Sequence, residues 1–245
     1  MSEPLLSATS LRKSFGALLV VDDVSFDVAG GEVLGVMGPN GAGKTTMLNL
    51  VSGALAADGG RITLGGHDVT RTGVVGRCRR GIGRTHQVPR PFERMSVFEN
   101  VLVGATNGAA AVGQRRRDRY RLANAAIERA GLGGKANRLA GSLPLLDRKR
   151  LELARALATA PQVLLLDEIA GGLTEPEVHE LVALVLELRE SGLAIVWIEH
   201  VVHALMATVD RLMALTYGRV IAQGDPQAVM ASEELQHAYL GTVTL

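Results

Sequence analysis

A glycine-rich string between an apolar run and a helical pattern has the residue types for phosphate chemistry. The apolar run is Val33-Leu34-Gly35-Val36-Met37, and the lysine that follows the glycines is Lys44. Glycines let backbone N–H groups turn inward around phosphate oxygens, and the N-terminus of the next helix adds the positive end of its dipole. Lys44 would reach the β- and γ-phosphates, and the Thr45 hydroxyl would bind Mg²⁺. We interpret the string as a P-loop that binds a nucleoside triphosphate, rather than a turn without a ligand: Gly38-Pro39-Asn40-Gly41-Ala42-Gly43-Lys44-Thr45-Thr46.

Two further apolar runs end in side chains that could complete such a site. Asp167 and Glu168 follow four apolar residues, the pattern of a buried parallel strand whose carboxyl end faces a ligand crevice. We expect Asp167 to hold Mg²⁺ and Glu168 to polarise the attacking water, rather than both acids being solvated at a turn. His200 ends the run at 193–198 in the same way. A lone histidine is more often structural, but this position favours a catalytic one.

Phe15 and Gln87 are weaker candidates, and the residues alone leave both open. Phe15 is either a platform on which a nucleotide base stacks or an ordinary core or edge-strand aromatic. Gln87 precedes Pro89 and Pro91. Its amide could bind within the ligand sphere of the metal or hold the attacking water, or it could simply end a strand.

The segments that must position these residues follow an α/β pattern with one interruption. Residues 5–28 alternate apolar and polar around a turn at Phe15-Gly16, which predicts antiparallel strands before the P-loop strand. From residue 91 to about 140 the period is helical, with Ser96 and Glu99 placed as a capping box. A further helix is predicted at 143–157. We therefore predict an α/β core with an all-helical insert at residues 89–157.

Several local segments have weaker patterns. The basic segment 77–84 is predicted as a solvated turn or helix end. The Ala- and Gly-rich segment 104–113 is predicted as a loop, and Asp58-Gly59-Gly60 as a turn. Five arginines within 114–121 are interpreted as a solvated helix face, because the aromatic partners needed for nucleic acid binding are absent.

Composition excludes several classes of protein. Apolar residues make up 47% and aromatics 3% of the 245 residues, with 29 glycines, as in an aliphatic α/β protein. The net charge of +1 gives no overall attraction to nucleic acid, and one cysteine excludes an internal disulfide. The N-terminus lacks the form of a secretion signal, and every apolar run is strand-sized. We expect a protein that is soluble when isolated and cytoplasmic.

The order of these motifs along essentially the whole chain resembles an ABC transporter ATP-binding subunit. The order is Phe15, the P-loop, Gln87, the helical insert, the helix at 143–157, Asp167-Glu168 and His200. The resemblance implies one domain over residues 1–245, with a P-loop NTPase (RecA-like) core and antiparallel β subdomain in 1–88 and 158–245. It implies ATP and Mg²⁺ as ligands. It also implies a base-stacking Phe15, a Gln87 that senses Mg²⁺ and the membrane partner, a catalytic base at Glu168 and a His200 that contacts the γ-phosphate.

The same resemblance implies partners and a location. Two such subunits would close head to tail on the cytoplasmic face of the cell membrane, each completing the ATP site of the other. The partners would be a second ABC ATPase, transmembrane permease subunits and, indirectly, a solute-binding protein, with no nucleic acid.

Finer cues resemble the larger ATPase of branched-chain (hydrophobic) amino acid importers. They are Gly83-Arg84-Thr85-His86-Gln87, Pro91-Phe92, Ile198-Glu199-His200 and the run from Tyr217 to Gly224. Importers of urea, amides or aromatic acids share such cues. A soluble ABC ATPase that acts on nucleic acid or ribosomes is the alternative from another class, and a non-hydrolysing regulatory subunit is a third.

The sequence departs from the family pattern at three places. The signature, normally near LSGGQ, aligns with Leu143-Pro144-Leu145-Leu146-Asp147, which lacks the serine hydroxyl and the glycines. Asp147 would put a carboxylate near polyphosphate unless it points away, and Ser142 could substitute only if the register slipped. Ile169 replaces a proline, and Thr174 occupies the position of an aspartate. Because a signature serves the ATP on the opposite subunit, we predict one competent and one impaired site in a pair with a different ATPase.

Overall fold

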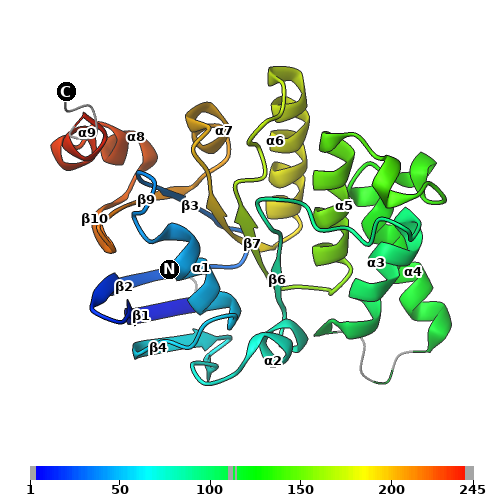
Figure 1. Ribbon diagram of the computed structural model, residues 1–245, viewed down its shortest axis with the longest axis horizontal. Helices are drawn as coiled ribbons and strands as arrows, with labels where there is room; N and C mark the ends of the chain where they lie inside the picture. Colours follow the sequence, from blue (N-terminus) through cyan, green and yellow to red (C-terminus); the bar gives the residue numbers. More distant parts are fainter. Residues whose placement is uncertain (1–3, 110–112, 114, 241–245) are drawn as a thin grey trace.

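An antiparallel sheet forms one side of the protein (Figure 1). The computed structural model describes residues 4–109, 113 and 115–240. The order of this sheet is β2-β1-β4-β5, and β1 and β2 meet at the predicted turn after Phe15. The residues predicted to alternate therefore do form a hairpin. Its strands are β1 (Leu6–Phe15), β2 (Leu18–Val28), β4 (Gly59–Leu64) and β5 (His67–Asp68).

A second, six-stranded sheet crosses the centre in the order β10-β9-β3-β8-β7-β6. All neighbours are parallel except β10, which pairs antiparallel with β9. The carboxyl ends of β3, β6, β7 and β8 therefore lie along one edge, which is where ligands bind in open α/β sheets. The strands are β3 (Val33–Met37), β6 (Ile82–Arg84), β7 (Val163–Asp167), β8 (Ala194–Ile198), β9 (Arg211–Thr216) and β10 (Arg219–Gly224).

Both faces of the central sheet are buried, which explains the apolar runs of its strands. Val163 and Leu165 pack in a cluster with the antiparallel sheet and helix α1 (Lys44–Ser52). Leu164 and Leu166 pack in the other cluster with the remaining helices. The P-loop helix is thus held between the two sheets through its buried residues Met47, Leu48, Leu50 and Val51.

A group of helices stands beside the second sheet, as predicted for the insert (Figure 1). It consists of α3 (Val97–Asn107), α4 (Arg116–Arg129) and α5 (Leu145–Leu157). The predicted capping box of Ser96 and Glu99 is present at the start of α3. The other helices are α2 (Val74–Arg79), α6 (Glu175–Glu190), α7 (Val202–Met206), α8 (Pro226–Met230) and α9 (Glu233–Leu240).

The loop prediction for 104–113 was wrong in its first part, because α3 continues to Asn107. A Cβ on Gly104 would lie 2.4 Å from the Arg155 carbonyl oxygen, so this glycine lets α3 approach α5 closely. Gly108 ends the helix, and residues 110–112 and 114 lie outside the described part of the chain.

Two boundaries also differ from prediction. Strand β4 begins at Gly59 within the predicted turn, and Pro144 precedes α5 as its N-cap.

The basic segment 77–84 contains the end of a helix, as one of its two predictions stated, because α2 ends at Arg79; the prediction that it is solvated was wrong for Arg77. Arg77 is only 1% exposed, and its guanidinium donates to the carbonyls of Leu50 and Val51 at the end of α1. A cation that binds the last carbonyls of a helix satisfies acceptors without an intrahelical partner. The charge pattern misled because it cannot distinguish an arginine at a buried helix end from one in water.

Candidate nucleotide site

The loop between β3 and α1 has a backbone that only glycine permits at two positions. Gly38 has φ +151°, and a Cβ there would lie 2.1 Å from the Leu215 carbonyl oxygen. Gly43 has φ +97°, and a Cβ there would lie 2.5 Å from the Val20 carbonyl oxygen. Close packing of strands around the loop therefore excludes side chains and leaves backbone N–H groups to line the site.

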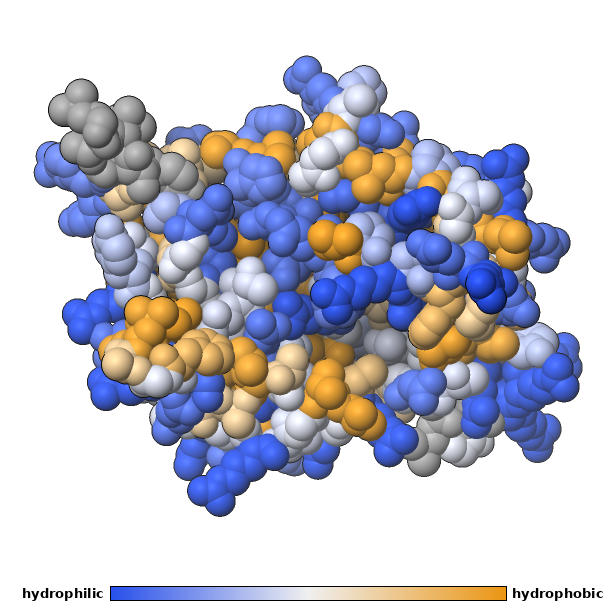
Figure 2. Space-filling view, in the orientation of Figure 1, coloured by the Kyte–Doolittle hydropathy of each residue, from blue (hydrophilic) through white to orange (hydrophobic). Residues whose placement is uncertain are grey.

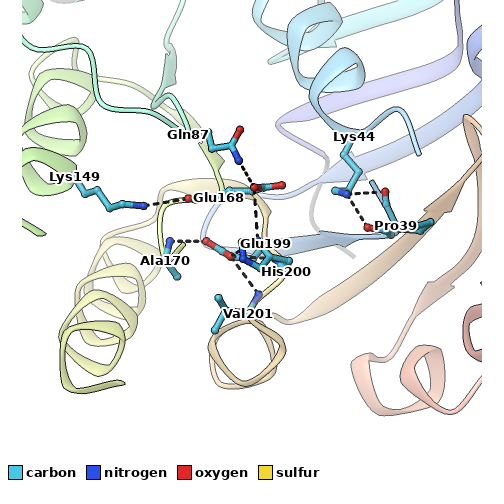
Figure 3. Close-up of polar contacts among 10 residues, drawn as sticks. Pro39, Lys44, Gln87, Lys149, Glu168, Ala170, Glu199, His200 and Val201 are labelled. Atoms are coloured by element: carbon cyan, nitrogen blue, oxygen red, sulfur yellow. Dashed lines mark hydrogen bonds and ion pairs between the residues drawn. The ribbon is translucent and has the colours of Figure 1, made fainter. Parts of the chain in front are cut away.

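Lys44 begins α1 and lies folded over the loop (Figure 3). Its Nζ donates to the carbonyl oxygens of Gly38 at 2.7 Å and Pro39 at 3.0 Å. Burial lowers the pKa of Lys44, and the charges of Glu168 and Asp167 oppose that shift. The lysine is thus a buried cation facing two carboxylates, and a phosphate bound in the loop would lie between these charges.

A pocket of about 510 Å³ opens beside this loop. Gln87, Glu168 and His200 line it together with the loop, although they are far apart in the sequence. Gly38, Pro39, Asp167 and Phe15 are not part of the lining. The remaining lining residues are Val20, Asn40, Gly41, Ala42, Gly43, Lys44, Thr45 and Thr46.

Phe15 ends β1 with 49% of its surface exposed, and the Lys13 ammonium lies 5.7 Å from its ring centroid. It is therefore an exposed aromatic outside the pocket lining rather than part of the core. Stacking of a base on this ring stays a prediction.

Two polar side chains, those of Gln87 and His200, meet at Glu168. Gln87 Nε2 donates to Glu168 Oε2 at 2.5 Å, and His200 Nδ1 lies 3.6 Å from the same oxygen. Glu168 follows β7, His200 follows β8, and Gln87 follows β6. The parallel sheet brings these groups together because all three strands end at the same edge (Figure 3).

Asp167 is buried in a way that fits a metal ligand. Its Oδ2 accepts from Arg84 Nη2 at 3.0 Å, while its Oδ1 is buried with no hydrogen-bond partner in the described chain. Unpaired buried acceptors are rare and call for an explanation such as a bound ion. Mg²⁺ binds through one or two carboxylates together with substrate phosphates and waters. The free Oδ1 and the Thr45 hydroxyl fit that role, and Gln87 lines the same pocket as Thr45.

No group of three or more His, Cys, Asp or Glu able to hold a metal occurs among the described residues.

Arg84 is a site residue that the sequence analysis missed. Its Nη1 donates to Asn49 Oδ1 at 2.6 Å and Ser52 Oγ at 3.0 Å, both on α1. Through Nη2 it also holds Asp167. It joins the P-loop helix to the end of β7. Its place on a short strand next to β7 was the available signal, but the other arginines of the segment 77–84 obscured it.

The Asp147 carboxylate at the start of α5 is engaged by a cation of this chain. Asp147 is 3% exposed, and Lys135 Nζ lies 2.5 Å from its Oδ2. The Ser142 hydroxyl donates to the Leu139 carbonyl at 2.8 Å. Pro144 supplies no side-chain cap. The first turn of α5 therefore has backbone N–H groups without a side-chain cap, and Leu145 is exposed beside them.

No described helix has both the length and the apolar character needed to cross a bilayer.

Known proteins resemble this chain in sequence and in fold. The family model described as ABC transporter matches residues 21–171. The high-affinity branched-chain amino acid transport ATP-binding protein LivG of Salmonella typhimurium is 38% identical, covering 98% of this chain and 99% of that protein. The lipopolysaccharide export system ATP-binding protein LptB of Haemophilus influenzae is 34% identical over 97% of each chain. A nucleotide-free ATP-binding cassette from an ABC transporter has a TM-score of 0.87 at 29% identity, over 97% of this chain and 99% of its own. The predicted fold is confirmed.

Proposed function

The chain belongs to the ABC transporter family as an ATPase that drives transport, and we propose that it powers uptake of branched-chain or other hydrophobic amino acids. The observation that supports this solute class is the full-length similarity to LivG. The similarity to LptB is nearly as extensive, so the proposed class of solute also depends on the finer sequence cues described above. Importers of urea, amides or aromatic acids are the alternatives within the same branch.

We assign the hydrolytic roles from the contacts at the pocket. Lys44 and the backbone N–H groups of the loop bind the β- and γ-phosphates. Glu168 orients the attacking water and accepts its proton as the water oxygen bonds to the γ-phosphorus and the bond to the bridging oxygen breaks. Gln87 holds the Glu168 carboxylate in place, and His200 contacts the γ-phosphate at the same end.

The metal site follows from the same geometry. Mg²⁺ bound to the nucleotide neutralises charge that develops on the phosphates. Thr45, Gln87 and Asp167 would hold it, with Asp167 contributing the oxygen that Arg84 leaves free. Arg84 fixes the orientation of that carboxylate.

We further propose that the site is completed by a different ATPase chain. The first turn of α5 has neither a signature serine nor the signature glycines. The Asp147 carboxylate forms an ion pair with Lys135. A copy of this chain would therefore offer a weak signature to its partner. A heterodimer with one strong and one impaired site reconciles this feature with the full set of groups around Lys44 and Glu168.

The permease would dock in a groove of about 280 Å³ between the core and the helical insert. Val74 and Cys78 of α2 line one side, and Gly104 of α3 lines the other. In the orientation of Figure 1, apolar side chains gather over the α2 region in Figure 2. His86 also lines the groove, and the next residue in the chain, Gln87, binds Glu168. A permease segment bound in the groove would therefore contact the residue that precedes Gln87.

A peripheral position on the cytoplasmic face of the membrane follows from such docking. The charge of the chain gives no other reason for membrane attraction, since its net charge is +1.

The test is to co-purify the chain from gently solubilised membranes, reconstitute the complex in liposomes and measure ATPase activity with added solutes. Stimulation by leucine, isoleucine or valine with their binding protein supports the proposal. Stimulation by urea, amides or aromatic acids alone would move it to a related importer. Co-purification with ribosomes, DNA or lipopolysaccharide-transport proteins would overturn it.

A further inference from the structure

The backbone at Glu168 is strained. Its φ is +47°, in the left-handed region that residues other than glycine seldom adopt. Such a conformation persists only where the surroundings hold it, and it is common at functional sites. The Glu168 N–H donates to the Ile198 carbonyl at 2.9 Å, which anchors one side of the residue. The residues that follow Glu168 must also be held in place by an anchor if this conformation is to persist.

Glu199 provides that anchor and is only 1% exposed. Its Oε1 accepts from the Ala170 N–H at 2.5 Å, two residues after Glu168. Its Oε2 accepts from the N–H groups of His200 at 3.0 Å and Val201 at 3.3 Å. One carboxylate oxygen thus holds the loop after β7, and the other holds the loop after β8 (Figure 3).

The two loops also touch through His200. A Cβ built on Gly171 would lie 3.3 Å from Cε1 of the imidazole, so the ring packs against this glycine. A shift of the loop after β7 therefore reaches both Glu168 and the histidine that shares its carboxylate oxygen.

Lys149 of α5 compensates the buried charge. It is 6% exposed, and its Nζ lies 3.4 Å from the Glu168 carbonyl oxygen. Burial raises the pKa of Glu199 and lowers that of Lys149, whereas the Glu199 and Glu168 charges oppose the shift at Lys149. The lysine therefore brings a balancing positive charge from the helical insert to the carbonyl of the strained residue.

We propose that Glu199 is a positioning residue for ATP hydrolysis, which clamps the loops carrying Glu168 and His200 into one unit with Lys149 as its counter-charge. The inference rests on the proposed role of Glu168 as the base. Glu199 itself cannot act as a second base, because it is buried and both of its oxygens are engaged by backbone N–H groups.

Glu199→Gln tests the clamp in the full-length chain with Mg-ATP as the probe. The amide has one acceptor oxygen, so its NH₂ group must face a backbone N–H and one loop is released. We expect kcat to fall roughly tenfold or more, because the base and His200 lose their orientation. Nucleotide affinity, measured with a fluorescent ATP analogue, should stay within about twofold, since Lys44 and the P-loop are untouched.

Amide hydrogen exchange gives a readout independent of activity. Exchange at Ala170, or at His200 and Val201, should accelerate in Glu199→Gln and remain slow in the matched control Glu190→Gln, an exposed glutamate near the end of α6. Glu199→Asp keeps two acceptor oxygens and should restore part of the rate.

Should Glu199→Gln fail to fold, Gly171→Ala tests the same link from the other loop. Its methyl group would press on the His200 ring, so kcat should fall at unchanged nucleotide affinity. Wild-type kcat in Glu199→Gln, or unchanged amide exchange, would overturn the clamp. Wild-type kcat in Glu168→Gln would instead refute the proposed role of Glu168 as the base. The amide exchange of Glu199→Gln would then still test whether Glu199 holds the two loops.

Discussion

Arg84 and Asp167 form a buried ion pair, with Nη2 of the arginine 3.0 Å from Oδ2 of the carboxylate. The side chains are 12% and 4% exposed. Arg84 binds α1 with its other amino group, so a single guanidinium links the P-loop helix to the proposed magnesium ligand. This leaves Asp167 with one free oxygen and one preferred orientation.

Arg84→Met should destabilise the fold. Removing one partner of a buried pair leaves an uncompensated charge, which costs about 3–5 kcal/mol. Urea unfolding followed by the fluorescence of the buried Trp197, the only tryptophan, would measure the change. The control is Arg189→Met, whose pair with Asp210 is 30% and 42% exposed and should be worth about 0–1 kcal/mol. Equal losses in both variants would show that the Arg84 pair contributes no special stability.

Glu168→Gln should abolish most hydrolysis but preserve ATP binding. Loss of a general base typically costs roughly 10²- to 10⁴-fold in rate. The measurement is steady-state ATPase activity of the reconstituted complex with this change in the present chain only. Glu234→Gln, on α9, is the matched control. Near-wild-type turnover would contradict the claim that Glu168 catalyses the dominant hydrolysis.

Pro144→Ser combined with Leu146→Gly should repair the weak signature. The serine hydroxyl and the glycine would let the start of α5 bind the γ-phosphate on the partner ATPase. In a single-turnover experiment on the heterodimer, the fraction of bound ATP that is hydrolysed should rise from about half towards completion. If the unmodified complex already hydrolyses all of its bound ATP, the proposed asymmetry is wrong.

Val75→Glu should weaken permease binding. Val75 lies on α2 with 60% of its surface exposed, next to the groove-lining Val74. A carboxylate placed in an apolar contact pays a desolvation cost without a partner. We expect less permease to co-purify while ATP binding is unchanged. Ala125→Glu on the exposed face of α4 is the control. If both variants co-purify with equal amounts of permease, the permease does not dock at α2.

Glu177 should make stability depend on acidic pH. Hydrogen bonds from the Thr174 backbone N–H and hydroxyl lower the pKa of Glu177 in the folded chain. A lowered folded pKa adds stability above the unfolded pKa, about 4.3, and this stability is lost as pH falls through the folded pKa. The melting temperature of Glu177→Gln should therefore fall less than that of the wild type between pH 7 and acid. Glu190→Gln on the same helix should behave like the wild type, and a parallel decline in all three would refute the assignment.

The amino-acid pattern was enough to predict the fold class, which is confirmed, and the candidate residues of the nucleotide site. A glycine loop with a lysine is unambiguous because few backbones other than a phosphate cradle need those glycines, and Gly38 and Gly43 indeed have no room for a side chain. Apolar runs that end in Asp167, Glu168 and His200 predicted strand ends, and parallel strands then had to bring these groups to one edge. The order of the motifs added the family.

The polar residues that support the site became evident from the folded chain. Arg77 and Arg84 lie in a charged segment that local pattern assigns to solvent, yet one caps α1 and the other holds Asp167. Glu199 and Lys149 lie on different segments, and Lys149 reaches the loop after β7, at the Glu168 carbonyl, only because α5 packs on the core. Local sequence encodes propensity and burial period, whereas the pairing of buried charges depends on which distant segments the fold places together. For this reason the P-loop could be predicted from the sequence, whereas the contacts of Arg77, Arg84, Glu199 and Lys149 could not.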